Sequence, residues 1–144
     1  LSFPHREGNA VWLRADLAAN RTACTMAYWH APLYSSGTHG NATRVRPLWE
    51  ALYEYGADVV LNGHDHRYER FAPQNANAQA DPKGIREFVV GTGGAKLYAQ
   101  SVRQPNSEAQ NDTNWGVIKL TLHAASYDWE FVPIAGQTFT DSGT

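Results

Sequence analysis

Residues 59–66 read Val-Val-Leu-Asn-Gly-His-Asp-His, an apolar run that ends abruptly in a polar cluster. Together with the two residues before it, the apolar part covers residues 57–61, which is typical of a short strand buried on both faces. Apolar side chains at helical spacing over residues 48–55 predict a preceding helix that ends at Gly56. Residues 22–29 are rich in β-formers and predict an earlier strand. Strand, helix and strand in this order predict a βαβ unit whose two strands are parallel neighbours.

The rest of the chain extends this unit into one side of a mixed α/β sandwich. We expect a helix over residues 9–19, a strand over 87–90, and a β-hairpin with strands around 118–122 and 127–131. Three segments are expected to lack regular structure: a polar loop at 63–70, an exposed excursion at 75–84 and a mobile polar segment at 99–114. We assign residues 1–144 to a single domain.

Composition excludes several classes of protein. Of the 144 residues, 42% are hydrophobic and 18% are charged, which suits a globular domain with a core. No apolar run is long enough to cross a membrane, and a formal charge of −2 gives no attraction for nucleic acid. The single cysteine, Cys24, excludes an internal disulfide framework. Asn-x-Thr sequons at Asn20, Asn41 and Asn111 would fit a secreted protein.

Histidines follow both strands of the predicted βαβ unit. His30 ends the first strand, and His64 and His66 come just after the second. Ligands of parallel α/β sheets bind outside the carboxyl ends of the strands, so we expect these three imidazoles within several ångströms of one another. Neutral imidazole nitrogens could then hold a divalent metal. The alternative is that each histidine is a hydrogen-bonded structural residue at the end of a strand.

Other polar motifs give weaker indications. The glycine-rich residues 91–94 could cradle a phosphate, but they lack a P-loop lysine, and we favour a structural turn. Arg67 and Arg70 flank the histidines and could contact a phosphate, but we favour a solvated rim for each of them. Ser35 and Ser36 lack a Gly-x-Ser-x-Gly context, which disfavours a serine hydrolase. The tryptophans fall at core-facing spacings, which disfavours a nucleic-acid-binding module.

Residues 28–37, 59–70 and 86–94 together resemble the C-terminal motifs of calcineurin-like metallophosphoesterases, closest to the purple-acid-phosphatase-like branch. The resemblance implies half of a four-layer αββα sandwich with a two-metal centre at the edge of its sheets. The substrate it implies is a phosphate monoester. The implied cofactors are two divalent or trivalent metal ions, such as zinc, iron or manganese.

The resemblance also implies a role for individual residues. His30 and His64 would bind one metal ion, and His66 the other. His39 would contact the phosphate and help to protonate the leaving group. Plant members often carry a second histidine after this position, where this chain has Gly40. Arg67, beside the histidines, is a further candidate for a contact with the substrate.

The carboxylate motifs of the family have no counterpart in this chain. Asp16 lies on a predicted amphipathic helix and Asp58 precedes a strand, so neither has the required context. We therefore expect this chain to be the C-terminal half of a secreted enzyme, inactive without its N-terminal half. Cys24 is expected to pair with a cysteine of that half. The inner face of the hairpin is expected to lack cover, so the chain alone could self-associate. The alternative is a non-catalytic metal-binding or interaction module.

Overall fold

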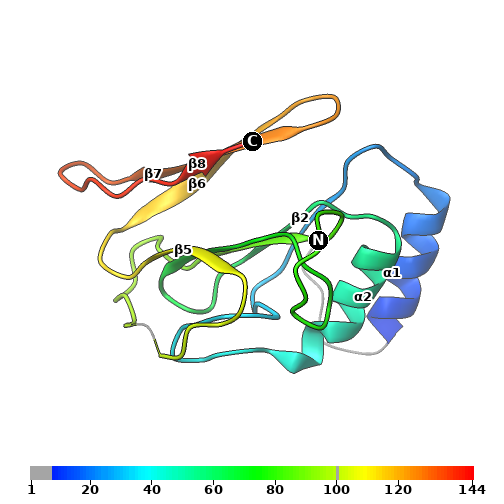
Figure 1. Ribbon diagram of the computed structural model, residues 1–144, viewed down its shortest axis with the longest axis horizontal. Coiled ribbons are helices and arrows are strands. Elements are labelled where there is room, and N and C mark those ends of the chain that lie inside the picture. The colour runs from blue at the N-terminus through cyan, green and yellow to red at the C-terminus, as the bar shows by residue number, and fades with distance from the viewer. Residues whose placement is uncertain (1–7, 100) are drawn as a thin grey trace.

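The computed structural model describes residues 8–99 and 101–144, which form three layers (Figure 1). Helices cover one face of a five-stranded sheet, and a small three-stranded sheet covers the other. In chain order the elements are α1 (Gly8–Ala19), β1 (Met26–Tyr28), the 3-10 helix η1 (Thr43–Val45), α2 (Arg46–Glu54), β2 (Val59–Asn62), β3 (Tyr68–Phe71), β4 (Arg86–Val90), β5 (Ser107–Asn111), β6 (Gly116–Leu122), β7 (Tyr127–Pro133) and β8 (Ser142–Gly143).

The larger sheet has the strand order β1-β2-β4-β3-β5. Its strands β1, β2 and β4 are parallel, with Met26 opposite Val59, whereas β3 is antiparallel to both of its neighbours. The predicted βαβ unit is therefore confirmed. Because β1 and β2 run in the same direction, the residues that follow them, His30 and His64, lie at the same edge of the sheet.

Helix α2 forms where the spacing of apolar residues predicts it. Pro47 stands in its first turn, where a missing N–H costs nothing. Trp49 and Leu52 are buried against the sheet. Gly56 follows with φ of +73°, a conformation in which a glycine avoids the strain that a side chain would bring. No helix of the described residues is long and apolar enough to span a membrane.

The hairpin β6–β7 packs on the larger sheet through its own aromatic residues. Trp129 and Phe131 are buried, and the Phe131 ring lies 4.8 Å from that of Tyr68 and packs in one cluster with Phe88. The prediction that this inner face lacks cover is therefore wrong for β7, because β3 and β4 supply the cover. Exposed apolar side chains remain elsewhere, among them Tyr28 on the edge strand β1, which is 54% exposed.

Two segments predicted to lack regular structure contain strands instead. β3 occupies the end of the predicted loop at 63–70, and β5 lies within the segment 99–114. Both strands carry polar side chains that face the interior and satisfy one another. Glu69 of β3 is fully buried and accepts hydrogen bonds from Ser107 and Gln110 of β5. Alternation of apolar residues could not reveal strands whose inward side chains are polar.

The other boundaries are close to those predicted. The first strand begins at Met26, later than residue 22, and α1 begins one residue before its predicted start. The excursion at 75–84 contains no named strand, but Ala76 is buried and Gln74 pairs with Ile85 as an isolated bridge. That excursion is therefore tied to the sheet and is only partly exposed.

A carboxylate near the C-terminus ties β8 to the larger sheet. Asp141 accepts hydrogen bonds from the Tyr68 hydroxyl and Arg70 Nε, both at 2.7 Å, and from Trp129 Nε1 at 3.3 Å. Burial opposes ionisation of this carboxyl, but the bonds from Arg70 and Tyr68 outweigh it and lower the pKa of Asp141. Its contribution to stability is therefore present above the unfolded pKa of about 3.9 and is lost as the pH falls through the lower folded pKa.

We expect Asp141→Ala to lower the free energy of unfolding by about 2–3 kcal/mol at neutral pH, because partly buried donors lose their acceptor. Urea unfolding at pH 7 and at pH 3 would measure this, and the difference between variant and wild type should shrink at the lower pH. Glu130→Ala removes an exposed carboxylate of the same sheet and should have little effect. Equal losses in the two variants would contradict the role of Asp141.

Candidate metal and phosphate site

Two of the predicted ligands face each other at the carboxyl ends of β1 and β2. His64 Nδ1 lies 3.1 Å from His30 Nε2, and the two rings meet edge to face. The backbone joins the same two loops, because Gly63 N–H donates to the His30 carbonyl at 2.9 Å. The expectation that His30 and His64 converge is therefore confirmed.

His39 joins this pair from the loop that follows β1. Its ring centroid lies 4.4 Å from that of His64. The loop is held by Asp65, whose Oδ1 accepts from His39 N–H at 2.9 Å and whose Oδ2 accepts from Ser35 Oγ at 2.5 Å. Asp65 is fully buried. Asp65, which stands between the two histidines of the Gly-His-Asp-His sequence, therefore positions the loop of His39. The motif alone did not indicate this role.

His66 makes different contacts. Its Nδ1 lies 2.9 Å from the Lys96 carbonyl oxygen, and its ring stacks on Tyr98 with centroids 4.3 Å apart. Tyr98 also contacts His39, so this tyrosine links His66 to the other histidines. The convergence of His66 with His30 and His64 stays a prediction. Within residues 8–99 and 101–144, no group of three or more His, Cys, Asp or Glu side chains is arranged to hold a metal ion.

The arginines do not form a solvated rim beside the histidines. Arg67 is 1% exposed and donates from Nη2 to Gln110, while its Nε and Nη1 have no partner among the described residues. Arg70 pairs with Asp141 and Glu108. The solvated-rim interpretation is therefore wrong for Arg67, which is buried just before the start of β3.

The backbone and charge state of His64 both mark it as unusual. Its φ of +67° lies in the left-handed region, which costs a non-glycine residue free energy and is common at functional sites. Burial lowers the pKa of His64 below its ordinary value, and the neighbouring His39 and His30 lower it further, against a raising effect of Asp65. The lowered pKa favours the neutral imidazole of His64, which carries a lone pair on one of its two ring nitrogens.

The two nitrogens of the His30–His64 pair lie at hydrogen-bond distance, and the same separation can be compared with that of two ligands of one metal ion. Two nitrogens bound to a tetrahedral zinc at about 2.0–2.1 Å would lie about 3.3 Å apart. The observed 3.1 Å between His64 Nδ1 and His30 Nε2 is close to this separation. The separation of the two nitrogens is therefore compatible with a shared borderline metal such as zinc.

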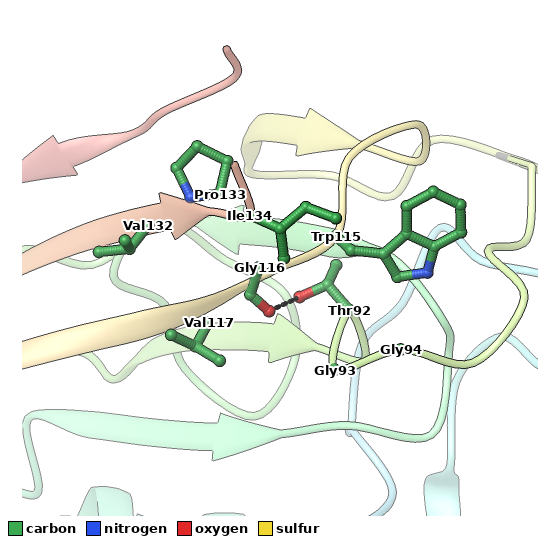
Figure 2. A pocket seen from close by; sticks show the side chains of 9 residues that line it. All are labelled: Thr92, Gly93, Gly94, Trp115, Gly116, Val117, Val132, Pro133 and Ile134. Carbon is green, nitrogen blue, oxygen red and sulfur yellow. Dashed lines mark hydrogen bonds between the residues drawn. The ribbon is translucent and has the colours of Figure 1, made fainter. Parts of the chain in front are cut away.

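Residues 91–94 form a structural turn at the base of the hairpin, as favoured from the sequence. Thr92 is fully buried and its Oγ1 donates to the Gly116 carbonyl at 2.7 Å (Figure 2). The Gly116 N–H donates back to the Thr92 carbonyl. The adjoining open pocket of about 460 Å³ is lined mainly by apolar groups of Val117, Val132, Pro133 and Ile134, which gives no cradle for a phosphate.

Gly91 lets the turn pass directly over the histidine motif. A Cβ added at Gly91 would lie 2.0 Å from the Asp65 carbonyl oxygen, a backbone atom that cannot move aside. We expect Gly91→Ala to lower the free energy of unfolding by about 3 kcal/mol, the upper end for overpacking. Urea unfolding would measure it. Gly93→Ala is the matched control, since its Cβ would meet nothing within 4 Å; an equal loss there would contradict the clash.

Comparison with known proteins defines the class. Residues 2–68 match the sequence model of the calcineurin-like phosphoesterase family. Purple acid phosphatase 15 of Arabidopsis thaliana is 42% identical over 89 residues, covering 58% of this chain and 16% of the plant protein. Purple acid phosphatase 21 of the same plant is 38% identical over 130 residues, covering 82% and 30% respectively.

A solved structure agrees on the fold. Purple acid phosphatase PPD1 from yellow lupin superimposes with a TM-score of 0.81 at 22% identity, covering 97% of this chain and 29% of the lupin chain. The chain thus has a calcineurin-like phosphoesterase fold. Within that class it is a relative of the purple acid phosphatases, and it spans less than a third of the length of these three relatives.

Proposed function

We propose that this chain supplies the histidine ligands of a metal-dependent phosphomonoesterase. His30 and His64 would hold one metal ion, and His66 the other. The observation that carries the proposal is the 3.1 Å approach of the His30 and His64 nitrogens at the carboxyl edge of the sheet. The family resemblance supports phosphoester hydrolysis as the reaction.

In this proposal His39 binds the phosphate and donates a proton to the leaving oxygen. Its loop is fixed by Asp65, and its ring lies on His64, so it would approach the ester from beside the ligands. Bound metal ions would supply Lewis acidity and an activated water. Arg67 stays a weaker proposed phosphate contact, because its free Nε and Nη1 are buried and would need exposure when substrate binds.

The carboxylates of Asp65 and Asp58, the acidic residues on either side of β2, already have hydrogen-bond donors. Asp65 is occupied by Ser35 and His39, and Asp58 accepts from Thr25 N–H at 2.8 Å. Two adjacent cations repel each other and need bridging negative charge. We therefore propose that the complete protein includes an upstream carboxylate-bearing half, with a phosphate ester as substrate, and that it acts outside the cell.

The test compares hydrolysis of a chromogenic phosphate ester by the 144-residue chain and by a protein that also carries the upstream half. We expect turnover at background for the chain alone and metal-dependent turnover for the longer protein. Background turnover in both would contradict the enzyme proposal and favour the non-catalytic metal-binding module. Turnover by the chain alone would show that its carboxylates come from within these residues.

A second test concerns Cys24, which is exposed and free within the described residues. If the protein acts in an oxidising compartment, an orphan cysteine would be expected to have a partner. We predict that Cys24 forms a disulfide with the upstream half. Thiol titration of the longer protein under non-reducing conditions should find Cys24 blocked, and a free thiol there would contradict both the pairing and the extracellular location.

A further inference from the structure

The segment from Ala95 to Tyr98 holds His66 by three separate contacts. The Lys96 carbonyl oxygen lies 2.9 Å from His66 Nδ1. The Tyr98 ring stacks on the His66 imidazole with an interplanar angle of 14°. The Tyr98 N–H donates to the His66 carbonyl at 2.9 Å. Trp115 Nε1 in turn donates to the Ala95 carbonyl at 2.8 Å, which anchors the start of the segment.

These contacts determine which nitrogen of His66 is available. A carbonyl oxygen can only accept a hydrogen bond, so His66 Nδ1 must carry a proton. In the neutral imidazole the lone pair then belongs to Nε2. The stacked Tyr98 ring restricts rotation of the imidazole out of this plane. A histidine that binds metal is commonly oriented in the same way by a partner on its other nitrogen.

Tyr98 also contacts the candidate acid. Its ring centroid lies 5.4 Å from that of His39, in an edge-to-face arrangement with an angle of 70°. One side chain, half-buried, therefore touches both His66 and His39. No motif in the sequence marked Tyr98, which follows the glycine-rich turn and lies 32 positions after His66 (98 − 66).

We propose that Tyr98 is a positioning residue that orients His66 with Nε2 as its ligand atom and keeps His39 beside it. The inference rests on the proposed function, since it gives His66 and His39 the roles of ligand and acid. The backbone carbonyl of Lys96 sets the tautomer, and the Tyr98 ring keeps His66 in reach of that carbonyl. The aromatic ring of Tyr98 is the required feature, and its hydroxyl is not.

Nitrogen-15 NMR of the histidine rings tests this on the 144-residue chain, without metal or substrate. At about pH 8, where ordinary histidines are neutral, wild-type His66 should be found mainly as the Nδ1-protonated tautomer. Tyr98→Phe should keep that tautomer. Tyr98→Leu, which fills similar space without a ring, should shift most of the population to the Nε2-protonated form. Lys96→Ala, which leaves the carbonyl in place, should behave as wild type.

A second readout uses the longer protein. Tyr98→Leu should weaken zinc binding about ten- to a hundredfold, the usual cost of losing a ligand's outer partner, while Tyr98→Phe should stay near the wild-type value. An unchanged His66 tautomer in Tyr98→Leu would overturn the inference whatever the turnover. If the tautomer shifts as expected but the longer protein hydrolyses no ester, the proposed function fails and the orientation of His66 by Tyr98 stands.

Discussion

Replacing His64 with alanine in the protein that carries the upstream half should reduce phosphate-ester turnover more than a hundredfold. Loss of an outer partner of a metal ligand already costs about ten- to a hundredfold, so loss of the ligand itself should cost more. His64 also lies between the other two histidines. Its Nδ1 is 3.1 Å from His30 Nε2, and its ring centroid is 4.4 Å from that of His39. The measurement is kcat and KM for a chromogenic ester at saturating zinc.

His123→Ala is the matched control for His64→Ala. His123 is an exposed histidine that pairs with Asp128 across the turn of the β6–β7 hairpin, a part of the fold that carries none of the candidate site residues. We expect His123→Ala to keep wild-type turnover. Urea unfolding of both variants separates loss of the site from loss of the fold. Near-normal turnover in a folded His64→Ala protein would contradict the assignment of His64 as a ligand.

The largest loss of stability is expected for Asp65→Ala, at about 4 kcal/mol. The fully buried carboxylate accepts from Ser35 Oγ and His39 N–H, and each buried donor left without an acceptor costs about 1–3 kcal/mol. Gly37 packs directly on this carboxylate, so alanine would also leave a cavity there. Urea unfolding of the variant chain against wild type gives the difference.

Asp65→Asn should cost much less than Asp65→Ala. The amide oxygen can accept from His39 N–H, and the hydroxyl of Ser35 can turn to accept from the amide nitrogen. Asp128→Ala, which removes an exposed carboxylate, provides the surface control. A loss as large in Asp128→Ala, or an equal loss in Asp65→Asn and Asp65→Ala, would show that the hydrogen bonds of Asp65 do not hold the loop of His39.

Local pattern was enough to predict the elements whose buried faces are apolar. The helix at residues 48–55, the buried strand that follows it and the hairpin strands all appear close to their predicted places. Parallel pairing of β1 with β2 followed from the helix between them, and with it the meeting of His30 and His64. The family resemblance then added His39, which the structure places on His64.

Tertiary structure alone decided the features in which buried polar groups satisfy one another. Strands β3 and β5 were missed because Glu69 and Gln110 face inward and find their partners in distant segments, in each other across the sheet and in Ser36 of the loop after β1. Arg67, just before β3, is also buried and donates to Gln110 of β5.

The roles of Asp65 and Tyr98 also depend on segments that meet only in the folded chain. Asp65 holds the loop of His39, 26 positions earlier in the chain. Tyr98 stacks on His66, 32 positions before it (98 − 66). The sequence by itself determined that His30 and His64 meet at one edge of the sheet, because the helix between their strands makes those strands parallel neighbours. Their orientation depends on long-range hydrogen bonds and ring contacts, and no local pattern encodes those partners.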